Sequence, residues 1–328
     1  MKIRSIARTT CSLSVLLFLA CLGGLTLFTP DPAPGADDEM TLHLALLPVP
    51  DVFPAYVARQ QGYFQDGGIT VEILPVGSAV ERDQLLQAGR IDGMVNEVGG
   101  AMLFNRDRVQ MKIVSFARIP LGDAPLFRVL AAPGTAIASV ADLAGVPVAV
   151  SMNTVIEYVS TRLLESGGVA ESAIRFASVP VLPERLQLLL TGQLAAATLP
   201  EPLGSAAIQA GAVEVVSDLK LAGLSASVIS FSSEAVRDKE EAVKRFMVAW
   251  NRAVVDLNAD SQRFQPLLLQ TIRVPKNVVD TYRIPPYPGP SVPSRDQWDD
   301  VLGWMQKKQL ITTPVSYDDS VTTAFLPR

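Results

Sequence analysis

The stretch VPVAVSMNTVIEYVSTRLLESGG, Val146–Gly168, decides how the rest of the chain is interpreted. Its first five residues are apolar and predict a buried strand, and the apolar residues of Ile156–Leu163 then recur at helical spacing. The polar turn between the strand and the helix leaves free backbone N–H groups, at a place where α/β proteins bind ligands. Thr154 and Glu157 also fit a capping box, which would satisfy those groups internally. A ligand site and a helix cap therefore both stay open here.

Short apolar strands alternate with amphipathic helices along the chain. The predicted strands are Leu42–Leu47, Ile69–Leu74, Ile91–Val95, Leu126–Ala132, Val146–Val150, Leu194–Leu199, Val213–Val216 and Val228–Phe231. The other predicted helices are Ala55–Gln61, Glu81–Ala88, Glu240–Leu257 and a last helix, capped by Ser294, that carries Trp298, Leu302 and Met305. The five prolines within Ile284–Pro293 predict an extended connector. This alternation predicts parallel or mixed sheets that are covered on both faces.

One segment of the chain is echoed 103 residues later. Glu81–Gly89 reads ERDQLLQAG and Glu184–Gly192 reads ERLQLLLTG, so six of nine positions are identical. Each copy is followed by a predicted strand that ends near a glutamate, Glu97 in the first case and Glu201 in the second. A real echo predicts two similar α/β lobes, and chance similarity between two amphipathic helices is the alternative.

The composition is that of a globular protein. The chain has 328 residues, of which 48% are hydrophobic and 19% charged, and this length suits about two domains. Removing residues 1–36 takes away three basic residues and one acid, which changes the net charge from −5 to −7. An acidic chain of this kind argues against a nucleic-acid partner.

The first 36 residues have the pattern of a secretory signal with a short linker. Three basic residues precede the apolar run Leu13–Phe28, and proline and small residues follow it. The run is short for a membrane span. Two alternatives stay open: cleavage after Gly35 or Ala36, and lipidation of Cys21, although Phe18–Cys21 (FLAC) departs from the usual lipoprotein pattern. We therefore expect an extracytoplasmic protein, in the periplasm or at the outer face of the cytoplasmic membrane, with membrane contact only through an anchor at Cys21.

The inventory of reactive side chains argues against most enzyme classes. Cys11 and Cys21 are the only cysteines, and both lie in the signal region. His43, in a predicted strand, is the only histidine, so neither a Ser-His-Asp triad nor a histidine zinc site has the residues that it needs. We expect no catalytic residues, no metal site and no cofactor.

Several motifs spread over residues 41–328 carry a family resemblance. They are PAYVARQQGYF at Pro54–Phe64, ITVE at Ile69–Glu72, GS at Gly77–Ser78, GRIDG at Gly89–Gly93, DLAGVPVAV at Asp142–Val150, PEP at Pro200–Pro202 and the helix segment Val243–Trp250. Together they resemble the extracytoplasmic solute-binding proteins of ABC importers, in the branch that includes the nitrate, sulfonate, taurine and thiamine-precursor binders.

The resemblance implies a two-lobe periplasmic-binding-protein fold of the type II kind. Each α/β lobe would hold a mixed sheet flanked by helices, and two crossing strands would join the lobes, at Leu126–Ala132 and Val228–Phe231. Lobe one would comprise residues 41–127 and 226–328, and lobe two residues 128–225. Ligands of such proteins lie between the lobes, at the carboxyl ends of the strands, and hinge closure traps them.

Side chains in the loops that follow the strands are the candidate ligand contacts. They are Asp51, Phe53, Ser78, Asn96, Glu97, Arg118, Ser151, Asn153, Thr154, Tyr158 and Glu201. For the hydroxyl and amide side chains the alternative role is capping or turn formation, and for Asp51 and Arg118 it is a solvated surface charge. Arg82 and Arg185 are alternative structural partners for Glu97 and Glu201.

The acids among these candidates bear on the ligand. A sulfonate, nitrate or sulfate site needs donors and arginine and avoids carboxylates, whereas Asp51, Glu97 and Glu201 are all acidic. We therefore expect an amine-bearing or heteroaromatic ligand, such as a thiamine-type pyrimidine or a flavin, with Phe53 or Tyr158 stacking on it. A sulfonate, taurine or nitrate is the alternative within the family.

The leading functional hypothesis is a monomeric binding protein that delivers a small organic solute to an ABC permease and its ATPase and performs no chemistry. A ligand sensor for a membrane receptor is one alternative. A pyrimidine-synthesis enzyme resembling this family is another. That enzyme type carries a lysine, a histidine and a cysteine-rich motif, and this chain has no cysteine after Cys21.

Overall fold

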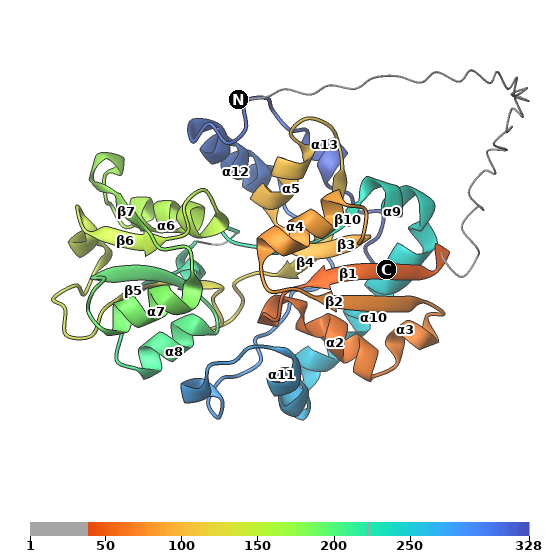
Figure 1. Ribbon diagram of the computed structural model, residues 1–328, viewed down its shortest axis with the longest axis horizontal. Coiled ribbons are helices and arrows are strands. Elements are labelled where there is room, and N and C mark those ends of the chain that lie inside the picture. Colours follow the sequence, from red (N-terminus) through yellow and green to blue (C-terminus); the bar gives the residue numbers. More distant parts are fainter. Residues whose placement is uncertain (1–38, 222, 328) are drawn as a thin grey trace, which may run out of the picture. The chain divides into compact units, whose positions relative to one another are not determined.

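The computed structural model of the protein describes residues 39–221 and 223–327 (Figure 1). The predicted secretory signal, its cleavage position and the predicted lipidation of Cys21 lie outside the described residues. The elements of the described part form two separate sheets, each covered by its own helices.

The first sheet has five strands in the order β2-β1-β3-β10-β4. They are β1 (Thr41–Leu46), β2 (Thr70–Pro75), β3 (Gly93–Glu97), β4 (Met111–Arg118) and β10 (Ser227–Ser232). β1 runs parallel to β2 and β3, while β10 is antiparallel to both of its neighbours. The helices in this part of the chain are α2 (Phe53–Gln60), α3 (Tyr63–Asp66), α4 (Ala79–Gln87), α5 (Val98–Asn105), α9 (Ser233–Asp238), α10 (Glu240–Ala259), α11 (Gln265–Thr271), α12 (Arg295–Lys307) and α13 (Tyr317–Ser320).

The second sheet repeats this arrangement with the order β7-β6-β8-β5-β9. Its strands are β5 (Phe127–Ala131), β6 (Pro147–Val150), β7 (Arg175–Ser178), β8 (Ala196–Pro200) and β9 (Val213–Ser217), and its helices are α6 (Val155–Ser166), α7 (Leu182–Leu190) and α8 (Leu203–Gln209). We call residues 39–118 and 227–327 the first half and residues 127–217 the second half.

The predicted internal echo is confirmed by the structure. A displacement of 103 residues carries the bounds of α4 onto those of α7 and the bounds of β3 onto those of β8. The arginine of each copy makes the same bond: Arg82 Nη1 donates to the Val95 carbonyl at 2.9 Å, and Arg185 Nη1 donates to the Thr198 carbonyl at 2.8 Å. The two halves therefore share one supersecondary unit, and the echo is not a chance match of two helices.

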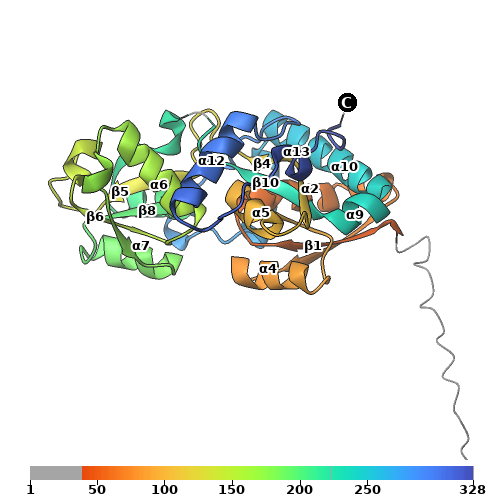
Figure 2. The ribbon, with the colours of Figure 1, turned by 90° about the horizontal axis from the view of Figure 1, so that it is seen from above.

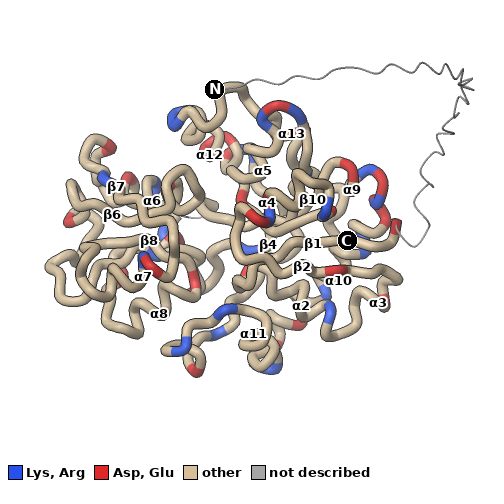
Figure 3. Tube along the Cα trace, viewed as in Figure 1, with Lys and Arg blue, Asp and Glu red and all other residues tan. Residues whose placement is uncertain are grey.

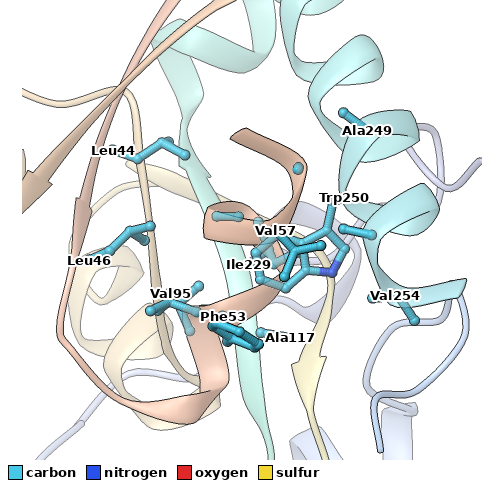
Figure 4. Packing of buried hydrophobic residues seen from close by; sticks show 14 of the residues in the cluster. Leu44, Leu46, Phe53, Val57, Val95, Ala117, Ile229, Ala249, Trp250 and Val254 are labelled. Carbon is cyan, nitrogen blue, oxygen red and sulfur yellow. The ribbon is translucent and has the colours of Figure 1, made fainter. Parts of the chain in front are cut away.

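The core of the first half confirms the amphipathic helix predicted over Glu240–Leu257. Figure 4 shows the packing of α10 and α2 side chains, including Trp250 and Val57, against residues of the sheet such as Ile229. Phe246 of α10 lies 1% exposed, with its ring centroid 5.6 Å from that of Phe64. Fully burying a large apolar side chain contributes ~1.5–3 kcal/mol, so this helix is a main source of stability for the first half.

The crossings between the sheets differ from the prediction. The two strands expected to cross, β5 and β10, each lie within one sheet, and the described residues that lead from one half to the other are 119–126, 218–221 and 223–226. Pro120 and Pro125 lack the N–H group that a continuous ladder requires, so β4 ends before the first crossing. Gly122 there has a φ of 61°, in a conformation that favours glycine.

Asp218 fastens the two crossings to each other. Its carboxylate accepts the backbone N–H groups of Leu126 and Phe127, each at 3.1 Å, and the hydroxyl of Ser225. The side chain is fully buried, and burial raises the pKa of Asp218 from 3.8 to about 6, although the hydrogen bonds from Ser225, Leu126 and Phe127 oppose that rise. One buried carboxylate therefore holds the start of β5 and the end of the second crossing.

Replacing Asp218 by asparagine should change how stability depends on pH. Because the folded-state pKa of Asp218 lies above its unfolded value, the protonated acid is favoured by folding, and that stabilisation is lost as the pH rises through about 6. We expect the free energy of unfolding of the wild type, relative to Asp218→Asn, to fall by ~2–3 kcal/mol between pH 4 and pH 7. Urea unfolding across this range measures it, with the exposed Glu234→Gln as control, and a pH-independent difference would contradict the assignment.

Candidate functional site

A cavity of about 210 Å³ is lined by residues of both halves, and we call it cavity 1. The first half contributes α4, the β3–α5 junction with Glu97, and Phe116 of β4. The second half contributes Asn153, Thr154, Val155 and Tyr158. The structure thus brings together four predicted site residues, Glu97, Asn153, Thr154 and Tyr158. Most of its lining is apolar, as is usual for small-molecule sites.

Glu97 places a carboxylate in cavity 1 at the carboxyl end of β3. The nearest cation is Arg82, whose Nη2 lies 3.8 Å from Glu97 Oε2. Arg82 is buried, donates Nη1 to the Val95 carbonyl and donates Nε to Asp83 at 2.9 Å, so its direct hydrogen bonds go elsewhere. Burial raises the pKa of Glu97, with Arg82 opposing the rise and Asp83 and Asp51 adding to it. The carboxylate therefore keeps acceptor capacity for a donor in the cavity.

Two N–H groups at the turn before α6 are bonded by side chains of the protein. Thr154 Oγ1 accepts the Ile156 N–H at 3.2 Å, and Glu157 accepts the Asn153 N–H at 2.5 Å. Glu157 is buried and also accepts from Lys308 Nζ at 2.6 Å. Neither bond of the predicted capping box forms, because Thr154 accepts the N–H of Ile156 and not that of Glu157, and Glu157 bonds the N–H of Asn153 and not that of Thr154. A buried carboxylate at this helix start disfavours a second anion there.

Aromatic side chains form one wall of cavity 1. The ring of Tyr158 lies edge-on to Trp304 of α12, with centroids 5.6 Å apart and an interplanar angle of 66°. Phe116 and the α12 residues Val301 and Met305 continue this wall. The hydroxyl of Tyr158 points away from the aromatic contact and donates to Asp300 at 2.6 Å. These rings give cavity 1 an apolar, aromatic surface against which a flat solute can pack.

A second cavity of about 380 Å³, cavity 2, is lined by the charged candidates Arg118 and Glu201. Glu201 lies here and binds Arg128 Nε at 2.5 Å and the hydroxyl of Ser205 at 2.6 Å. Arg118 is 1% exposed, donates Nη2 to the Pro125 carbonyl at 2.7 Å and has its Nη1 3.7 Å from Asp51 Oδ2. In cavity 2, Glu201 is therefore paired with Arg128 and Arg118 faces Asp51, while Arg118 Nε is buried without a hydrogen-bond partner.

The other predicted residues contact the protein framework and line neither cavity. Phe53 is fully buried in the core under α10, and its ring does not line either cavity (Figure 4). Asn96 is 1% exposed and accepts the hydroxyl of Ser230 at 2.7 Å. Ser78 caps α4 by accepting the Glu81 N–H. Ser151 accepts from Arg185 Nη2, so Arg185 supports this loop and does not pair with Glu201.

Neither a cluster of metal-ligating side chains nor a membrane-spanning helix is found among the described residues. No group of three or more histidine, cysteine or acidic side chains there is arranged to hold a metal ion. Within the same residues, none of the helices combines the length and the apolar character that crossing a membrane requires. Figure 3 shows acidic and basic residues intermixed along both halves.

The family of the chain follows from a comparison of its sequence with family models. Residues 49–263 match the model described as NMT1/THI5 like. The chain belongs to the NMT1/THI5-like family. No protein of the curated set matches the sequence. The matched segment ends before α12, so the helix that supplies Trp304 lies beyond it.

Solved structures of low sequence identity show that this NMT1/THI5-like chain has the periplasmic-binding-protein fold. The aliphatic sulphonate-binding protein of Escherichia coli matches with a TM-score of 0.71 and 16% identity, over 84% of this chain and 94% of that one. The ligand-binding component of an ABC-type import system from Staphylococcus aureus matches with a TM-score of 0.71 and 12% identity, over 87% and 97%. The enzyme DszB, in complex with biphenyl-2-sulfinic acid, matches with a TM-score of 0.67 and 16% identity, over 87% and 97%.

Sequence reasoning missed the contribution of α12 to the site. The pattern predicted a capped helix with a buried face, and the structure confirms both the Ser294–Gln297 capping box and the burial of Trp298 and Met305. A buried face does not reveal which part of the chain it covers. The prolines before α12 and its two tryptophans are the only signals in the sequence. They indicate that the helix packs against the protein, but they do not indicate which segment it packs against.

The equivalent arginines of this family member provide a matched stability test. Arg185 has only neutral acceptors, and burial lowers its pKa to about 10, whereas Arg82 also faces Asp83 and Glu97. We expect Arg82→Met to lower the free energy of unfolding by ~3 kcal/mol. The loss for Arg185→Met should be smaller by ~1–2 kcal/mol, because the Arg185 substitution removes an uncompensated buried charge. Urea unfolding at pH 7 compares the two. A larger loss for Arg185→Met would contradict this account.

Proposed function

We propose that the protein is an extracytoplasmic solute-binding protein of an ABC importer that captures a small amine-bearing or heteroaromatic solute in cavity 1. The observation that carries the proposal is the Glu97 carboxylate, which lies in a largely apolar, aromatic-walled cavity and whose nearest cation donates its hydrogen bonds elsewhere. Family membership and the shared fold support the class of protein.

The chemistry of cavity 1 favours a solute that donates hydrogen bonds. An amino group or ring N–H can donate to Glu97, while its ring packs against Tyr158, Trp304 and Phe116. A thiamine-type pyrimidine or a flavin has both features. Asn153 and Thr154 line the opposite wall and supply polar contacts for a carbonyl or ring acceptor.

We propose that lobe one, residues 41–127 and 226–328, and lobe two, residues 128–225, close about the crossings when a solute binds. The remaining predicted contacts, Asp51, Ser78, Ser151, Arg118 and Glu201, lie at or just after the ends of strands, where closure would bring the lobes together. The loaded protein would then deliver its solute, as a monomer, to the permease and ATPase. The predicted secretory signal places it outside the cytoplasm, with Cys21 as the possible point of lipid attachment.

Alternative functions predict different ligands or partners. A sulfonate, taurine or nitrate binder would need donors free to meet an anion, and the start of α6 is already occupied by Glu157. A ligand sensor would pass its solute signal to a membrane receptor instead of a permease. An enzyme of this fold is disfavoured because the described residues contain no cysteine and their one histidine, His43, contacts Glu72 and Asp92 away from cavity 1.

A thermal-shift screen followed by calorimetry tests the ligand class. We expect an aminopyrimidine or riboflavin to raise the melting temperature, because a ligand that binds only the folded state stabilises it by ~2.7 kcal/mol at 100 times its dissociation constant. Taurine, ethanesulfonate and nitrate should leave it unchanged. Tight binding of these anions, with no response to pyrimidines or flavins, would overturn the proposal.

Glu97→Gln should weaken binding of an amine-bearing ligand by ~10- to 100-fold, the loss expected for a hydrogen bond to a charged group. Because burial raises the pKa of Glu97, binding of a cationic ligand by the wild type should weaken on acidification at a higher pH than an ordinary glutamate would cause. Calorimetry at several pH values measures both effects. Glu234→Gln, at an exposed position of α9, is the control and should bind like the wild type.

A further inference from the structure

Helix α12 belongs to the first half by its packing and yet is bonded to the second. Its N-terminus is capped by Ser294, and Trp298 Nε1 donates to the Val315 carbonyl at 3.1 Å, so its root is fixed in the first half. Figure 2 shows α12 lying between the two groups of helices. From the next turns, Asp300 and Lys308 reach α6 of the second half.

The bonds to the second half form a compact polar attachment. Asp300 accepts from the hydroxyl of Tyr158 at 2.6 Å and from Arg162 Nη2 at 2.7 Å. Lys308 Nζ donates to the buried Glu157 at 2.6 Å. We call these contacts of Asp300 and Lys308 the α12–α6 attachment.

The same helix closes one side of cavity 1. Val301, Trp304 and Met305 line the cavity from α12, and Tyr158 lines it from α6. Tyr158 has a double position, because its ring meets Trp304 at the cavity wall while its hydroxyl bonds to Asp300 in the attachment. Separating α12 from α6 would therefore remove the wall and break the attachment in one movement.

The surroundings of the attachment suit reversible release. Two further cavities, of about 320 and 530 Å³, lie along α12 where it faces α6. The side chains of Asp300 and Lys308 are 45% and 31% exposed. Water can therefore reach the polar contacts of Asp300 and Lys308, whereas release of α12 would also expose the buried rings of Tyr158 and Trp304.

We propose that α12 is a strap that closes cavity 1 and must release from α6 before the cavity opens. The strap would control access to the proposed binding site. It rests on the proposed function only for the identity of the solute that enters cavity 1. Binding of a solute against Tyr158 and Trp304 would favour the attached state, and attachment would favour the bound solute by the same factor. The strap itself is testable without a solute.

The test uses the full chain without ligand and the variants Tyr158→Phe and Asp300→Ala. Tyr158→Phe keeps the cavity ring and removes only the hydroxyl bond to Asp300. Hydrogen exchange of residues 155–166 and 295–307 should become about tenfold faster in both variants, since each loses hydrogen bonds to a charged group. Acrylamide quenching should rise for Trp304, assigned by subtraction with Trp304→Phe. Lys308→Met is a second, independent release variant and should act in the same direction.

Arg295→Gln is the matched control, because it removes an ion pair of α12 that stays within the first half, from Arg295 to Asp318 at 2.6 Å. It should leave exchange and quenching unchanged. Release variants that behave like this control, or that accelerate exchange equally in β8 and β10, would overturn the strap, since the contacts would then be inert or would only hold the fold. The ligand screen is separate from this result, so the strap can fail while the proposed function stands, and the reverse.

Discussion

The structure depends on one bond that is made twice, from a buried arginine on a helix to a carbonyl in the strand that follows. Arg82 ties α4 to β3 through Val95, and Arg185 ties α7 to β8 through Thr198. Each bond fixes the carboxyl end of a strand, and these ends supply Glu97 to cavity 1 and Glu201 to cavity 2. The two acids, Glu97 and Glu201, are therefore positioned by arginines that belong to the same repeated segment of the sequence.

Periodicity and the echo predicted most of the fold because both report local burial. The alternation of strands and helices, the apolar face of α10 and the capped last helix all follow from spacing along the chain. The crossings could not be read in this way. Apolar strands that cross between sheets and apolar strands that lie within one sheet have the same pattern, and only the strand pairing places β5 and β10 inside their sheets.

The site was less predictable because neighbouring residues on a strand point to opposite sides. Asn96 and Glu97 are adjacent, yet Asn96 lies buried against Ser230 while Glu97 lines cavity 1. Phe53 follows the first strand, where a ligand contact is expected. It is, however, the first residue of α2, and its side chain packs into the core. The partner of a carboxylate is also invisible to spacing, since Lys308 reaches Glu157 from 151 residues away.

The two halves share a scaffold but differ in how their charges are balanced, and this difference decides what each cavity offers. In the second half, Glu201 is neutralised by Arg128, and Glu157 is neutralised by Lys308 while it occupies the start of α6. In the first half, Arg82 is the nearest cation to Glu97, but its guanidinium donates hydrogen bonds to the Val95 carbonyl and to Asp83. An anion entering cavity 1 would therefore meet a carboxylate, whereas an amine would regain in Glu97 the hydrogen bond that it leaves in water.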